Sequence, residues 1–267
     1  MKRTLTSKMK LALAIGLSLT VATPALAGFP KTPVNKCADD AVVAGTVCLD
    51  TYEASVWRVT DPAVVKKIQK GKATLADLSG STQLGVGGDD YAPCTDNGQN
   101  CANDIYAVSL PGVTPSADIT WFQAQEACAN AGKRLPTSAE WQVGANGTPD
   151  TGADNGTTDC NTNSSFIAEL TGSRSSCVSA QGASDMVGNL VEWVADWVPR
   201  STACPGWDGF SDDEMCLSGA STTADGPGAL LRGGIFFFSF GTSAGPLTVD
   251  NRAPSISDPG ISFRCAR

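Results

Sequence analysis

Gly182-Ala-Ser-Asp-Met-Val-Gly-Asn-Leu-Val-Glu-Trp193 is the stretch of this 267-residue chain that decides its fold. Two blocks come before it, Trp121-Phe-Gln-Ala-Gln-Glu-Ala-Cys128 and Gly132-Lys-Arg-Leu-Pro-Thr-Ser-Ala-Glu-Trp141. Two more follow it, Leu231-Arg-Gly-Gly234 and Ile261-Ser-Phe-Arg-Cys265. The fold assignment rests on the order and spacing of all five blocks, and no single block decides it alone.

In that order and spacing, the five blocks resemble the formylglycine-generating enzyme (sulfatase-modifying factor) family. The resemblance covers most of the chain after about Cys48. It implies an α+β fold of the C-type-lectin-like kind, with long loops pinned by disulfides. We therefore expect a sulfatase-modifying-factor-like domain over residues 42–267, with an insertion at about 61–118, after an N-terminal lead over residues 28–41.

The first 27 residues have the composition of a secretory signal peptide. Lys2 and Arg3 give a positive start, residues 11–21 form a short apolar run, and Ala25-Leu-Ala27 is a small-residue cleavage site. The apolar run is too short for a comfortable membrane span, although a retained anchor is the alternative. We expect export to a periplasm or the cell exterior without stable membrane insertion. The formal net charge of −8 makes nucleic acid a poor partner.

Ten cysteines follow the predicted signal peptide, and an even number in an exported chain indicates disulfides. Local spacing suggests the pairs Cys37–Cys48, Cys94–Cys101, Cys160–Cys177 and Cys204–Cys216, although sequence alone does not fix connectivity. Cys128 and Cys265 remain, and the family resemblance also implies this pair. The chain has no histidine, which excludes Ser-His-Asp and Cys-His hydrolases and histidine-ligated metal sites.

Local patterns predict the main elements. Residues 42–59 read as strand and hairpin. A helix should start at Asp61-Pro62 and break at Gly71, with its apolar face formed by Val64, Val65, Ile68, Leu75 and Leu78. A clearer helix is predicted over residues 120–131, and a shorter one opens at Pro136 with a Thr137–Glu140 capping box. Loops are expected at 80–104, 144–162 and 199–229, and strands at 230–240 and 260–264.

The chemistry of the family needs residues that this chain does not have. According to the resemblance, active members use two cysteines between the Arg-Gly-Gly block and the final Phe-Arg-Cys block, where they bind Cu(I). Here that segment, residues 235–252, contains no cysteine. We therefore expect no catalytic residues, no copper and no formylglycine generation. The alternative is a thiol oxidase of the same type, acting on exported proteins, that uses Cys204 and Cys216 instead.

The same resemblance implies a structural calcium ion at the Gly-Asn-x-x-Glu-Trp turn. Its ligands would be the side chains of Asp185 and Glu192 and the main-chain carbonyls of Gly188 and Leu190. Carboxylates and carbonyls are the oxygen ligands that Ca²⁺ prefers. In the alternative interpretation, Asp185 caps a turn and Glu192 pairs with an arginine.

The run Ile235-Phe-Phe-Phe-Ser-Phe240 is the candidate recognition segment. Strand alternation would place Phe236, Phe238 and Phe240 on one face, either in the core or exposed to a ligand. The resemblance implies that this segment forms the active groove in the enzymes and the ligand-binding face in related variable proteins. With Asp250, Asn251 and Arg252 as a polar rim, we predict a non-catalytic surface that binds a protein, peptide or glycan.

Six further residues in the family blocks are interpreted as scaffold, forming buried ion pairs and aromatic plugs between helices and sheet. They are Arg134, Glu140, Trp141, Trp193, Arg232 and Arg264.

Overall fold

The computed structural model describes residues 36–198, 215–216, 228–237 and 244–267. The predicted signal peptide, most of the N-terminal lead, Cys204, Phe238 and Phe240 lie outside these ranges. Strands β1 (Ala41–Ala44) and β2 (Val47–Asp50) form an antiparallel hairpin. Main-chain hydrogen bonds between Cys48 and Arg267, 2.8 and 2.9 Å long, join β2 to the end of the chain.

The predicted insertion at about 61–118 supplies two strands, β4 and β5, of a three-stranded sheet whose order is β4-β3-β5. The strands of this sheet are β3 (Ala54–Arg58), β4 (Thr82–Leu84) and β5 (Ile105–Ser109), so a short strand lies within the predicted 80–104 loop. Helix α1 (Pro62–Gln69) begins as predicted, because the Asp61 side chain accepts a hydrogen bond from the amide of Ala63. Leu78 is buried, but the expectation for Leu75 was wrong: it lies beyond the helix and is 51% exposed.

Two helices follow, and each begins with a capping box. Helix α2 (Trp121–Asn130) is capped by Thr120 with Gln123, and helix α3 (Ser138–Ala145) by Thr137 with Glu140. In each box a threonine hydroxyl and a side chain three residues later satisfy main-chain amides that the first helical turn leaves free. The predicted α2 stripe is buried at Ala124, Ala127 and Cys128.

The larger sheet has the strand order β10-β6-β8-β9-β7. Its strands are β6 (Val191–Val198), β7 (Met215–Cys216), β8 (Gly228–Arg232), β9 (Val249–Arg252) and β10 (Ile261–Phe263). The predicted strand over 230–240 is wrong for residues 233–237, and residues 238–240 lie outside the described ranges. Gly233 and Gly234 have φ values of 91° and 81°, and a side chain on Gly234 would collide with Ala244, so the chain turns there.

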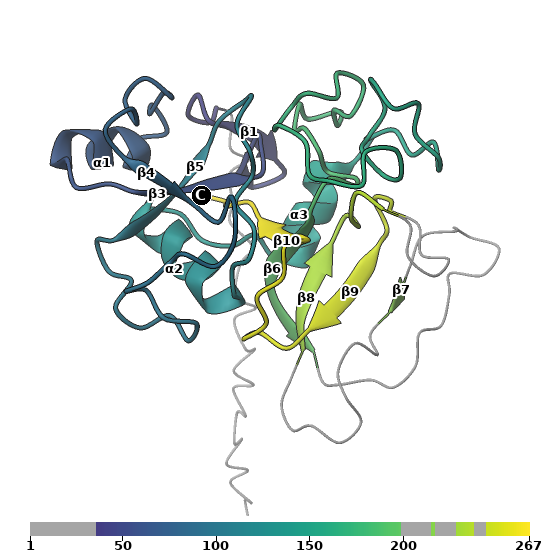
Figure 1. The fold of residues 1–267 in the computed structure, drawn as a ribbon. Helices are drawn as coiled ribbons and strands as arrows, with labels where there is room; N and C mark the ends of the chain where they lie inside the picture. Colours follow the sequence, from purple (N-terminus) through teal and green to yellow (C-terminus); the bar gives the residue numbers. More distant parts are fainter. Residues whose placement is uncertain (1–35, 199–214, 217–227, 238–243) are drawn as a thin grey trace, which may run out of the picture. The chain divides into compact units, whose positions relative to one another are not determined.

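Apolar side chains pack on both faces of the larger sheet. On one face, Trp193, Leu231 and Phe263 meet α2 and the three-stranded sheet (Figure 1). On the other face, Val194 and Leu230 meet α3 and the β1–β2 hairpin. Both layers exclude water from the turn at 182–193, which leads into β6.

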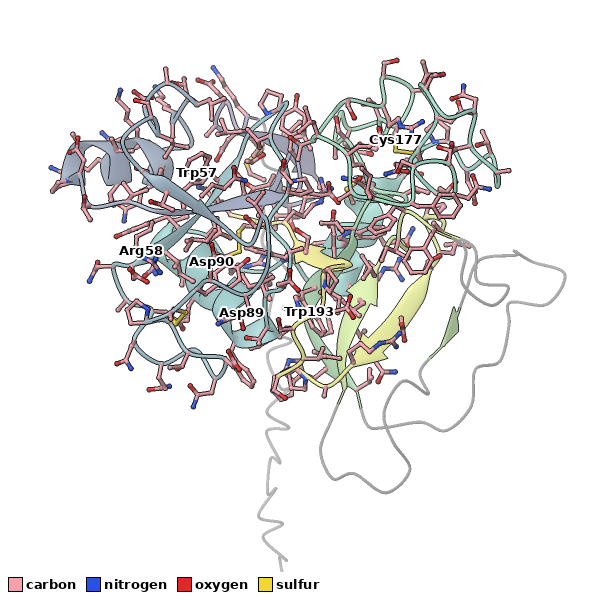
Figure 2. The ribbon with its side chains drawn as sticks, in the orientation of Figure 1. Trp57, Arg58, Asp89, Asp90, Cys177 and Trp193 are labelled. Carbon is pink, nitrogen blue, oxygen red and sulfur yellow. A yellow bond between two sulfur atoms is a disulfide. The ribbon has the colours of Figure 1, made fainter. Side chains whose placement is uncertain are left out.

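Four disulfides confirm four of the five predicted pairs, and no cysteine in the described ranges is free. They are Cys37–Cys48, Cys94–Cys101, Cys128–Cys265 and Cys160–Cys177. Figure 2 labels Cys177 within the loops that follow α3. Disulfides of this number are typical of exported proteins. Within the described part of the chain, no helix has the length and apolar character needed to cross a membrane.

Candidate functional site

A buried ion pair joins β6 to the end of the chain. Arg264 contacts both carboxylate oxygens of Glu192, with its Nη2 lying 2.6 Å from Oε1, and neither side chain is more than 1% exposed. The guanidinium also donates to the carbonyls of Asp50, Thr51 and Ser184. Trp141 donates its indole N–H to Glu192 Oε2 at 2.7 Å. These contacts agree with a scaffold role for Glu192, Arg264 and Trp141.

The other four predicted scaffold residues also make packing contacts or ion pairs. Trp193, labelled in Figure 2, is fully buried and donates its indole N–H to the carbonyl of Ile119 at 3.0 Å. The Arg232 guanidinium lies 4.8 Å from the ring centroid of Trp141. Arg134 binds Glu140 through two hydrogen bonds of 2.7 Å, but its side chain is 42% exposed. This pair therefore differs from the buried ion pair that we expected.

Three of the four predicted calcium ligands lie on one tight turn, and the fourth, Glu192, is the second residue of β6. Asp185 has a φ of 57°, and its Oδ2 accepts a hydrogen bond from the amide of Gly172 at 2.6 Å. Gly188 leaves no space for a side chain, because a Cβ would collide with the carbonyl of Asn161. The oxygens of Glu192 are already engaged by Arg264 and Trp141. These contacts follow the alternative interpretation, in which Asp185 holds a turn and Glu192 pairs with arginine.

Sequence reasoning missed a third carboxylate at this turn, that of Glu53. Glu53 is fully buried and accepts hydrogen bonds from the Asn189 side chain and from the Leu190 amide, the latter at 3.0 Å. Burial raises the pKa of Glu53 well above its usual value and the pKa of Asp185 to about 6. Within the described ranges, no group of three or more acidic, cysteine or histidine side chains is arranged to hold a metal ion.

The predicted recognition segment is only partly described. Phe236 and Phe237 are half-buried with their ring centroids 5.3 Å apart, and the Phe236 amide donates to the Asn189 carbonyl. Asp250 forms an ion pair of 2.5 Å with Arg252, whose side chain is 39% exposed. Burial raises the pKa of Asp250. Asn251 differs from the predicted exposed rim, because it is fully buried against Gly228.

An aromatic cluster at the edge of α2 was not predicted as a site. The rings of Trp121 and Trp197 meet edge to face with centroids 5.0 Å apart, and Phe122 lies 5.5 and 5.8 Å from the two. Trp197 is 39% exposed, and Trp121 and Phe122 are also partly exposed. Trp121 is fixed by the hydrogen bond from its indole N–H to the Val194 carbonyl, 2.8 Å long.

Strand register brings this cluster close to Arg252. Trp197 lies opposite Ala229 on β8, and Ala229 lies opposite Arg252 on β9. Directly opposed residues project from the same face of a sheet, so Trp197 and Arg252 share one row about 10 Å apart, with the fully buried Ala229 between them. The amide of Trp121 also bonds to the carbonyl of Pro254, two residues after Arg252. We call Trp121, Phe122, Trp197 and Arg252 the aromatic–arginine surface.

Residues 46–267 match the sulfatase-modifying factor enzyme 1-like domain, and the chain belongs to that family. The α+β architecture and the disulfide-pinned loops agree with the C-type-lectin-like fold of the family, as the five sequence blocks predicted.

Curated relatives match only part of the chain. It is 35% identical over 88 residues to serine/threonine-protein kinase Pkn1 of Chlamydia trachomatis serovar L2, a match that covers 31% of this chain and 14% of the kinase. It is 30% identical over 126 residues to serine/threonine-protein kinase Pkn1 of Chlamydia pneumoniae, covering 45% of this chain and 19% of that protein. The matched region is therefore less than a fifth of either kinase.

Among solved structures, PvdO from Pseudomonas aeruginosa is 19% identical with a TM-score of 0.44, covering 90% of this chain and 89% of PvdO. The Major Tropism Determinant P3c variant is 20% identical with a TM-score of 0.42, covering 85% of this chain and 52% of that protein. Similarity at this level concerns the fold alone.

Proposed function

We propose that this chain is an exported, non-catalytic member of its family that binds a protein, peptide or glycan. The observation that carries the proposal is the aromatic–arginine surface, where three partly exposed rings pack together and one of them, Trp197, lies in the same sheet row as the partly exposed Arg252. The cysteine-free segment 235–252 supports a role without thiol chemistry. The first residues and the disulfides support export to a periplasm or the cell exterior.

The composition of this surface suits recognition. Tryptophan, tyrosine and arginine dominate the energetically important positions of interfaces, because large rigid groups bury much area at a small entropy cost. Trp197 and Trp121 hold each other edge to face, so binding would not have to order them. Ala229, which lies between Trp197 and Arg252 in the sheet, is fully buried, so a partner would contact the two larger side chains on either side of it. Phe236 and Asp250 stay in the proposal as members of the predicted segment, as do Phe238 and Phe240, which lie outside the described residues.

We expect Trp197→Ala and Arg252→Ala to weaken partner binding at least tenfold while the domain remains folded, since truncating a dominant interface residue costs about 2 kcal/mol or more. The test is quantitative mass spectrometry of material captured from the native periplasm or medium, followed by affinity measurement with the purified partner. Phe166→Ala is the matched control, because Phe166 is a 70% exposed aromatic residue outside the surface. Equal capture by wild type and both surface variants would contradict the proposal.

The proposal also includes a structural calcium ion at the 182–193 turn. Three buried carboxylates, Glu53, Asp185 and Glu192, share this region with one buried guanidinium, that of Arg264. A divalent cation would offset the excess negative charge. Because Arg264 and Trp141 already engage Glu192, the proposal rests mainly on Asp185 and on the carbonyls of Gly188 and Leu190.

We expect the thermal midpoint to be higher in Ca²⁺ than in chelator, because an ion that binds only the folded state stabilises it, by about 2.7 kcal/mol at a hundredfold excess over Kd. The quantity compared between variants is this difference in midpoint, since a substitution can also change the stability of the protein without calcium. Asp185→Asn should abolish the difference, and Asp154→Asn, at a carboxylate in another loop, should preserve it. A midpoint that is the same in Ca²⁺ and chelator would exclude the site.

A further inference from the structure

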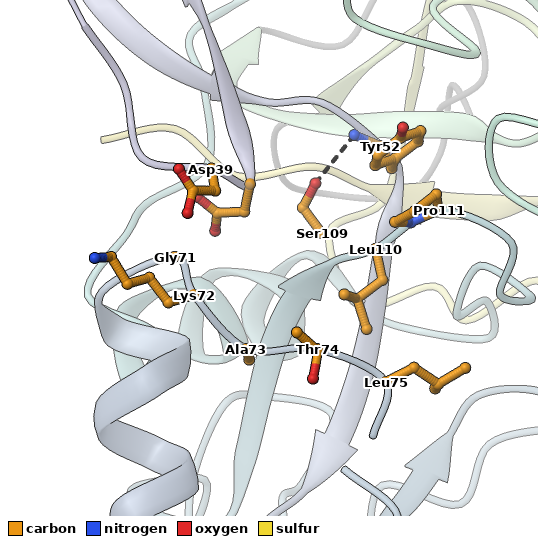
Figure 3. A pocket seen from close by; sticks show the side chains of 11 residues that line it. Asp39, Tyr52, Gly71, Lys72, Ala73, Thr74, Leu75, Ser109, Leu110 and Pro111 are labelled. Carbon is orange, nitrogen blue, oxygen red and sulfur yellow. Dashed lines mark hydrogen bonds between the residues drawn. The ribbon is translucent and has the colours of Figure 1, made fainter. Parts of the chain in front are cut away.

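A cavity is present in another part of the fold, lined by none of the residues of the aromatic–arginine surface. It has a volume of about 340 Å³ and opens between the start of β1, the loop after α1 and the end of β5 (Figure 3). Small-molecule sites in proteins span roughly 300–1,000 Å³, so this cavity is of the size that holds a small metabolite. No residue that lines it belongs to the recognition or calcium proposals.

One end of the cavity is apolar and rigidly built. Leu75, Leu110 and Pro111 line it together with the ring of Tyr52 (Figure 3). Leu75 is 51% exposed, so its side chain is accessible to a ligand. Gly71 packs directly against the Asp40 carboxylate, which leaves no space for a Cβ at this position.

The Asp40 carboxylate is already neutralised and is not available to a ligand. Lys133 contacts it at 2.7 Å and Arg267 at 2.9 Å. These two ion pairs fix the position of Asp40, and through Gly71 they also fix the loop that follows α1. The cavity wall is therefore pre-formed, and a ligand would not have to order it.

The other end of the cavity carries two charges that are free. Asp39 and Lys72 line the cavity, both are exposed, and neither forms an ion pair in the described structure. Ser109 lines the cavity between the two ends and is buried, and its Oγ accepts a hydrogen bond from the Tyr52 amide at 3.1 Å. Its hydroxyl proton has no acceptor among the described residues. The cavity thus offers one carboxylate and one hydroxyl donor next to an apolar wall, together with the Lys72 side chain, whose ammonium points away from Ser109 in Figure 3.

We propose that this cavity binds a small zwitterion with an apolar body, of the chemical class of free apolar α-amino acids. Asp39 pairs with the ammonium group of the ligand and Lys72 with its carboxylate, which the Ser109 hydroxyl can also reach. The apolar side chain of the ligand lies against Leu75, Leu110 and Tyr52. The long flexible stem of Lys72 lets its ammonium follow the ligand carboxylate, whereas a cavity for a simple amine would not need that cation.

Isothermal titration of the purified full chain tests the proposal with four probes. They are L-leucine, L-leucinamide, N-acetyl-L-leucine and glycine, at concentrations up to about 10 mM so that a Kd near 1 mM is detected. The proposal predicts binding of leucine and at least tenfold weaker binding of the other three, because each lacks the carboxylate, the ammonium or the apolar body. If leucinamide binds with the same affinity as leucine, the cavity is a site for amines and the proposal is wrong. No heat with any probe would overturn the proposal.

Variants separate the cavity from other sites. Asp39→Asn, Lys72→Gln and Leu75→Ala alter exposed side chains, so the fold should be retained, and each should weaken leucine binding at least tenfold. Lys66→Gln is the matched control, since Lys66 is an exposed lysine on α1 that does not line the cavity. Undiminished binding by all three cavity variants would place the ligand elsewhere. Trp197→Ala should leave leucine binding unchanged, so failure here is distinguishable from failure of the proposed recognition surface.

Discussion

Replacing Cys128 and Cys265 by alanine is expected to lower the free energy of unfolding by about 5 kcal/mol. The bond joins residues 137 apart in sequence, and in the chain-entropy model the stabilisation grows with the logarithm of the loop that the bond closes. Both cysteines are fully buried, and they tie α2 to the residues just after β10. Urea unfolding followed by fluorescence would give the change in free energy and in its denaturant dependence.

The matched control is the double alanine variant of Cys37 and Cys48. That bond spans only 11 residues, so the same model predicts a loss of about 3 kcal/mol. Counting thiols in unreduced, unfolded protein should also find none, with Cys204 and Cys216 included. A loss at Cys128–Cys265 that does not exceed the loss at Cys37–Cys48 would show that loop closure does not determine the stabilisation.

Arg264→Met is expected to destabilise the fold by about 3–5 kcal/mol, since removing one partner leaves a buried and uncompensated charge. Glu192 would lose its cation, and the carbonyls of Asp50, Thr51 and Ser184 would lose a donor. The double variant Arg264→Met, Glu192→Gln should recover part of the loss, because the remaining group is then neutral. Thermal and urea unfolding of the single and double variants would measure both effects.

Arg134→Met provides the comparison for this ion pair. Arg134 also binds a glutamate through two hydrogen bonds, but its side chain is 42% exposed, so water already screens the pair. Exposed ion pairs contribute about 0–1 kcal/mol. If Arg134→Met and Arg264→Met cost the same, burial would not be what makes the Arg264–Glu192 pair important.

The fold could be predicted largely from sequence, because its strongest determinants are local or recur as blocks. The Asp61 cap and the Thr137–Glu140 capping box each lie within a few residues, and both are confirmed. The strand predicted over 230–240 failed for a tertiary reason. An apolar alternating run favours a strand, but Gly234 packs against Ala244 with left-handed geometry, and the chain turns instead.

The candidate site was less accessible to sequence reasoning, because its parts are far apart in the chain. Glu53 meets the turn through Asn189 and Leu190, residues 136 and 137 positions away. Trp121 and Trp197 each show a helix or strand pattern, but only strand register and α2 packing bring them together beside Arg252. Trp193 and Trp197 lie on one face of β6, opposite Leu231 and Ala229, although the register shifts between them, and their spacing was the signal that could have pointed to the aromatic–arginine surface.

We propose that this family member binds a partner without the chemistry of thiol oxidation. Mass spectrometry of a cysteine-containing sulfatase peptide, incubated with the protein, oxygen and copper, distinguishes the two roles. We expect no conversion to formylglycine above a control without protein, because residues 235–252 offer no thiolate to hold Cu(I). Turnover that Cys204→Ser or Cys216→Ser abolishes would contradict it and assign the chain to the thiol oxidases.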